Sequence, residues 1–159
     1  MKDSSNFSAT ERVESLKAGA VAAFAVFFGF GAIAAVNSLI LAQRFDSLAS
    51  LQVRSIDLNF AFRWTMALLG GFLFGVTYRY AIRRDVNPQL KSGVVLAFGL
   101  VRAFGQLDAG LFFEAGKMPA WQELLPFAIR SVESVVLFAI AALVLDWAIG
   151  RSWIKPFDS

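Results

Sequence analysis

Four long apolar stretches alternate with short polar segments along this chain. The first, residues 18–42, contains no charged residue in 25 positions. About 20 consecutive apolar residues are enough for a helix to cross the hydrocarbon core of a membrane. Three further stretches, 64–82, 92–113 and 127–150, reach a similar length. Because lipid offers no partner for unpaired backbone groups, the pattern predicts an all-α integral membrane protein with four transmembrane helices.

Two segments of this pattern allow alternatives. The third stretch carries Arg102, Gln106 and Asp108. A charge at mid-membrane depth is costly, so a re-entrant or tilted amphipathic helix is the alternative to a full span. The connector 44–63 mixes charged and apolar residues, which is compatible with a short interfacial helix or with an ordinary loop.

The ends of the chain are polar. Residues 1–16 form a short N-terminal tail without the apolar core of a secretory signal, and residues 152–159 form a C-terminal tail. Residues 17–151 are therefore expected to fold as one transmembrane domain. An even number of spans places both ends of the chain on the same side of the membrane.

The basic residues indicate which side that is. Nine Lys and Arg residues lie on the side of the chain ends, and four lie on the other side: Arg44, Arg54, Arg63 and Lys117. Short cytoplasmic segments carry the excess of Lys and Arg in membrane proteins. Both termini are therefore predicted to be cytoplasmic, or stromal if the membrane belongs to a plastid.

The composition agrees with a membrane protein and excludes much enzyme chemistry. Apolar residues make up 57% of the chain and charged residues 17%, with 17 phenylalanines. Soluble domains average nearer to 45–50% apolar and about 25% charged. The chain has no cysteine and no histidine, so it lacks thiol nucleophiles, the commonest metal ligand and the usual general base. No nucleotide-binding loop and no basic patch with interleaved aromatic residues is present, so we expect neither an enzyme nor a nucleic-acid partner.

The second stretch contains a row of small residues, Ala67, Gly71 and Gly75, at a spacing of four. Such a row lets another helix backbone approach closely in lipid. The neighbouring helix can belong to a partner subunit or to this chain. Arg79, Arg83 and the adjacent Arg84 follow at the inner end of the stretch, where lipid headgroups or the carboxylate of a partner could contact them.

Four charged residues are predicted to lie inside the membrane: Arg102, Asp108, Arg130 and Glu133. If the third and fourth helices form a hairpin, residue counting at ~1.5 Å per residue brings Asp108 and Arg130 to similar depths, and Arg102 lies deeper, about one turn from Glu133. They can form ion pairs within the protein or with another subunit, or they can line an ion path. We expect Arg102 to face protein, with Glu133 or a carboxylate of another subunit as its partner. Asp108 lies about 120° from Arg102 around the helix, so one neighbouring helix cannot face both.

No cofactor is predicted, although a bound lipid or chlorophyll is conceivable. Without histidine, a chlorophyll magnesium could be ligated by Asn37, by Gln106, or by Glu133 paired with Arg130. The many phenylalanines would suit a pigment surface. Packing of phenylalanine against lipid and neighbouring helices explains the same composition without a pigment.

The pieces TYRYAIRRD, NPQLK and VRAFGQLD lie within residues 71–110. This segment resembles small multi-span membrane proteins of cyanobacteria and chloroplasts that have no clear biochemical assignment. The resemblance implies a cyanobacterial or thylakoid membrane and an association with photosynthetic complexes. It implies no functional residues.

These observations predict a non-catalytic accessory or assembly subunit of a larger membrane complex, and the resemblance implies a photosynthetic one. It would act through helix–helix docking, with membrane lipids and other integral membrane subunits as its partners. The alternative is a small transporter or channel whose pathway uses Arg102, Asp108 and Glu133.

Overall fold

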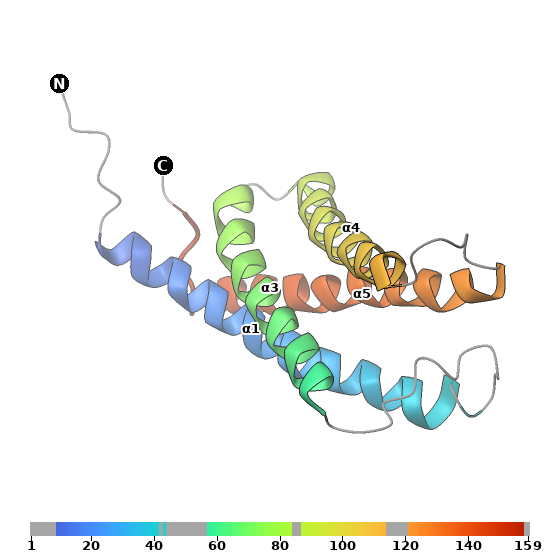
Figure 1. The fold of residues 1–159 in the computed structure, drawn as a ribbon. Helices are drawn as coiled ribbons and strands as arrows, with labels where there is room; N and C mark the ends of the chain where they lie inside the picture. Colours follow the sequence, from blue (N-terminus) through green and yellow to red (C-terminus); the bar gives the residue numbers. More distant parts are fainter. Residues whose placement is uncertain (1–8, 42, 44–56, 84–86, 114–120, 158–159) are drawn as a thin grey trace.

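The computed structural model describes residues 9–41, 43, 57–83, 87–113 and 121–157. These residues are almost entirely helical (Figure 1). The elements are α1 (Ala9–Val36), the π-helical segment η1 (Asn37–Leu41), α3 (Leu58–Ile82), α4 (Pro88–Phe113) and α5 (Trp121–Gly150). Within the described ranges, four helices are long and apolar enough to cross a membrane. The prediction of an all-α chain with four such helices is therefore confirmed.

The helices extend beyond the apolar stretches that predict them. α3 begins at Leu58 because Asp57 caps it: the Asp57 carboxylate accepts a hydrogen bond of 2.9 Å from the amide of Phe60. Part of the predicted connector thus belongs to α3, and residues 44–56 lie outside the described residues. α5 begins six residues before 127 and contains Pro126, which removes one backbone hydrogen bond near the helix start.

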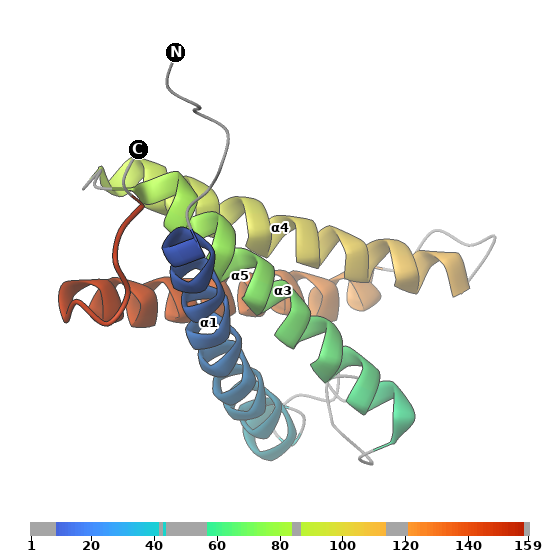
Figure 2. The same ribbon diagram turned by 90° about the vertical axis from the view of Figure 1, so that its left-hand side faces the viewer.

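The helices form two antiparallel pairs, α1 with α3 and α4 with α5, which cross each other (Figures 1 and 2). The starts of α1 and α4 lie near the ends of α3 and α5, and we call this the terminal end of the bundle. The two pairs diverge toward the opposite end, which we call the open end. α4 is one continuous helix through Arg102, without the break of a re-entrant segment.

Small residues let α1 and α3 approach closely. Gly71 and Gly75 of α3 are buried against α1. A Cβ atom added to Gly71 would lie 2.8 Å from Cγ2 of Val26, and one added to Gly75 would lie 2.7 Å from Cβ of Ala22. These distances leave no room for a side chain at either position, so the contact depends on glycine.

Aromatic rings join α3 to the other pair of helices. The ring of Phe74 lies 5.1 Å from that of Phe138 and 5.4 Å from that of Phe98, measured between centroids. The outer faces of the helices carry large exposed apolar side chains. Examples are Phe28, which is 69% exposed, and Leu143, which is 71% exposed. The apolar surface of this bundle thus faces outward as well as inward.

Candidate functional site

Arg79 is buried at the terminal end, with a residual exposure of 1%. Its guanidinium group donates hydrogen bonds to the Glu11 carboxylate (2.5 Å), the Ser15 hydroxyl (2.8 Å) and the carbonyl oxygen of Lys155 (2.8 Å). Arg79 therefore joins α1, α3 and the segment that follows α5. The guanidinium group thus lies inside the protein, and residues of the same chain accept its hydrogen bonds.

Glu14 holds the same C-terminal segment. Its carboxylate accepts a hydrogen bond of 2.9 Å from the backbone amide of Lys155 and one of 2.8 Å from the ammonium group of Lys17. Arg83 is exposed at this end and lies 5.7 Å from the ring centroid of Phe157. Arg84 lies outside the described residues.

A third contact ties α4 to α3 and α5 at the terminal end. The Asp146 carboxylate accepts hydrogen bonds from the hydroxyl of Tyr78 (3.1 Å) and from the ammonium group of Lys91 (2.8 Å). With the Arg79 and Glu14 contacts, this places a polar link on every helix of the bundle. Since each of these charged groups is held by partners from other elements, the terminal end is a structural anchor.

A second polar group lies between the helices, away from the terminal end. It surrounds a cavity of about 20 Å³ that receives residues from all four long helices. The lining residues are Phe30, Ile33, Arg63, Arg102, Gln106, Arg130, Glu133, Ser134 and Leu137. A volume of ~10–15 Å³ holds one water molecule, so there is room for a single small group.

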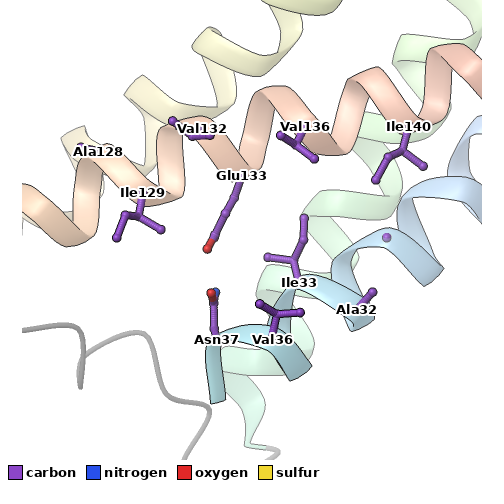
Figure 3. A pocket seen from close by; sticks show the side chains of 11 residues that line it. Ala32, Ile33, Val36, Asn37, Ala128, Ile129, Val132, Glu133, Val136 and Ile140 are labelled. Atoms are coloured by element: carbon purple, nitrogen blue, oxygen red, sulfur yellow. The ribbon is translucent and has the colours of Figure 1, made fainter. Parts of the chain in front are cut away.

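The charged residues of this cavity have different neighbours. Arg102 is half-buried, and its guanidinium carbon lies 5.9 Å from the ring centroid of Phe30. The Glu133 carboxylate points across to the side-chain amide of Asn37 (Figure 3). Among the described residues, Arg102 and Glu133 line one cavity without forming a direct ion pair.

Asn37 reaches this position through η1. A π-helical turn inserts an additional residue into the helix, and such turns are frequent at functional sites. Asn37 is the first residue of η1 and is buried. In the sequence, Asn37 and Ser38 are the two polar residues of the first apolar stretch, and Asn37 is considered there only as a chlorophyll ligand. Nothing in the sequence indicates the change of helical pitch.

An apolar groove adjoins the cavity. It lies between α1 and α5, has a volume of about 460 Å³, and is left open by the described side chains. Ala32 and Val36 line it from α1, and Val132 and Val136 line it from α5 (Figure 3). Glu133 lines both the groove and the polar cavity, so the two spaces meet at this residue.

The structure brings three of the four predicted intramembrane charges to the cavity: Arg102, Arg130 and Glu133. Asp108 is exposed and does not line it, in agreement with its angular distance from Arg102. The predicted row of small residues, Ala67, Gly71 and Gly75, is buried within the bundle, where Gly71 and Gly75 pack against α1 of the same chain.

Arg63 and Ser134 are cavity residues that the sequence analysis missed. In the sequence, Arg63 is used only in the comparison of basic residues on the two sides of the membrane. The signal that could have placed it is the Asp57 cap, which puts Arg63 one to two turns inside α3.

The described part of the chain contains no group of three or more acidic residues that could hold a metal ion. Comparison with protein families, with characterised proteins and with solved structures finds no match to this chain.

Proposed function

We propose that this chain is an integral membrane protein that crosses the membrane with its four long helices. The length and apolar character of the helices support this, as do the exposed phenylalanine and leucine side chains on their outer faces. Soluble monomers seldom expose large continuous apolar surfaces. The excess of Lys and Arg at the terminal end favours a cytoplasmic or stromal location for both chain ends.

Within the membrane, we propose a non-catalytic accessory or assembly subunit of a larger complex. The observation that carries this proposal is the apolar groove between α1 and α5. The occupant that fits it is a transmembrane helix of another integral membrane subunit. Gly29, Ala32 and Ala128 line the groove with little side-chain bulk, which permits the close backbone approach that drives helix association in lipid. The resemblance of residues 71–110 supports a cyanobacterial or thylakoid complex.

The experiment is gentle detergent extraction followed by native gel separation and identification of the comigrating subunits. Ala32→Phe fills the groove from an exposed position and should release the chain from its complex. Ala97→Phe, at an exposed position of α4 outside the groove, is the matched control. Comigration that is unaffected by Ala32→Phe would contradict docking in the groove, and migration of the wild type alone would contradict the accessory function.

A small transporter or channel is the second candidate, favoured by one observation. Polar residues of α3, α4 and α5 converge on the cavity around Arg102 and Glu133, and α1 closes it with apolar side chains. Asp108 of the predicted pathway does not contribute to this cavity. Uptake of radioactive ions into liposomes that contain only this chain tests transport. Flux that disappears in Glu133→Gln would favour it over the accessory function.

A further inference from the structure

Positive charge predominates around the polar cavity. The described residues that line it include three arginines from three helices, Arg63 of α3, Arg102 of α4 and Arg130 of α5, and one carboxylate, Glu133. Electrostatic interactions are stronger in the low-dielectric interior than in water. The guanidinium groups therefore repel one another unless a negative charge lies between them. Ionisable residues at membrane depth are costly unless they are paired or face water.

The single carboxylate does not balance the cavity. Glu133 also faces the side-chain amide of Asn37, on the groove side of the cavity. Arg130 takes part in further interactions within the protein. Even without Arg130, the two guanidinium groups of Arg63 and Arg102 face one carboxylate, and the described lining provides no second counter-charge. The ring of Phe30 beside Arg102 attracts the guanidinium group but does not neutralise it.

The cavity is lined by hydrogen-bond donors that can bind an anion. Gln106 lies one turn after Arg102 on the same face of α4 and brings a side-chain amide to the cavity. The hydroxyl of Ser134 donates to the carbonyl oxygen of Arg130 at 2.8 Å, so Ser134 is not a further donor. Guanidinium groups present several N–H donors in a planar fork that fits oxyanions.

The size of the cavity limits the ligand. About 20 Å³ accommodates one oxygen atom of a larger oxyanion but not a whole phosphate. Arg63 is exposed, so the rest of such an ion can lie at the rim beside it. We propose that this cavity binds the oxygen of a phosphate group through Arg63, Arg102 and Gln106. The phosphate comes either from the headgroup of an anionic phospholipid or from inorganic phosphate.

The test measures the apparent melting temperature of the purified full-length chain in an uncharged detergent. Three titrations are compared: sodium phosphate, sodium chloride at the same ionic strength, and mixed micelles of phosphatidylglycerol against phosphatidylcholine. We expect the melting temperature to rise with phosphate or with phosphatidylglycerol. A rise with inorganic phosphate identifies the free ion as a sufficient ligand, and a rise with phosphatidylglycerol alone identifies the lipid headgroup.

Variants assign the effect to the cavity. Arg102→Gln should raise the half-maximal phosphate or phosphatidylglycerol concentration tenfold or more, and Arg12→Gln, at an exposed position of α1, should leave it unchanged. Without ligand, Arg102→Gln should melt no lower than the wild type, because it removes an excess charge. Gln106→Leu is the second variant. It should also raise the half-maximal phosphate or phosphatidylglycerol concentration, although it does not change the charge of the cavity.

Three results would overturn the proposal: no response to either phosphate source, an equal response to chloride, or an undiminished response in Arg102→Gln and Gln106→Leu. The measurement uses this chain alone, so its outcome does not depend on whether a partner subunit occupies the neighbouring groove.

Discussion

Replacing Arg79 by Leu should loosen the terminal end of the bundle. The side chain is fully buried, and the change leaves the Glu11 carboxylate, the Ser15 hydroxyl and the Lys155 carbonyl without their common donor. Removing one partner of a buried ion pair costs about 3–5 kcal/mol. The Glu11 side chain is 20% exposed, so water can hydrate part of it and the lower end of this range applies. A loss of ~3 kcal/mol corresponds to a decrease in melting temperature of roughly 6–12 °C for a chain of this size.

The assay is thermal unfolding in detergent, with two further variants beside Arg79→Leu. Arg83→Leu removes an exposed arginine four residues later and should change the melting temperature by no more than about 2 °C. In the Glu11→Gln background, Arg79→Leu should cost less than it does alone, because the carboxylate that pairs with Arg79 is already absent. If Arg79→Leu and Arg83→Leu unfold at the same temperature, the terminal contacts do not stabilise the bundle and the reasoning is refuted.

Three other measurements test the structure. Gly75→Leu should lower the melting temperature far more than Leu73→Ala, because the new leucine side chain would overlap α1, whereas Leu73 is exposed. Equal effects of the two changes would contradict the α1–α3 contact. Glu133→Gln should destabilise the chain, and adding Arg102→Gln should restore part of the lost stability, with a coupling energy of roughly 0.5–3 kcal/mol between the two changes. Strictly additive effects of the two changes would show that the two residues do not interact. Tags at the two ends of the chain should be equally accessible to protease from the cytoplasmic side, and protection of one tag alone would exclude an even number of spans.

The helices could be predicted from the sequence because their apolar stretches are long and nearly free of charge. Their true starts could not be predicted in the same way. Residues 9–17 and 58–63 are helical but mix polar and apolar residues. A helix can therefore continue beyond its apolar stretch without any change in its backbone structure that the apolar pattern would reveal. The Asp57 cap is a local signal for the start of α3, and it was available in the sequence.

The candidate site was predictable only in part. The unusual charges Arg102, Arg130 and Glu133 mark it, because ionisable residues in an apolar stretch are rare. Which residues complete it depends on how the helices are rotated and paired. The row of small residues predicts a close contact but does not say that α1 is the neighbour. The π-helical turn that directs Asn37 toward Glu133 depends on packing between distant segments, which no local pattern reveals.

The two ends of the bundle differ in the contacts that hold the helices together. At the terminal end, contacts of Arg79, Glu14 and Asp146 link every helix, so the relative placement of the two helix pairs is fixed there. The helix pairs are already held together at the terminal end. At the open end, α1 and α5 diverge around the groove and the charged cavity. Substitutions at the two ends should therefore have different consequences. Arg79→Leu should reduce the amount of folded chain, whereas Ala32→Phe should leave the fold intact and remove the binding partner.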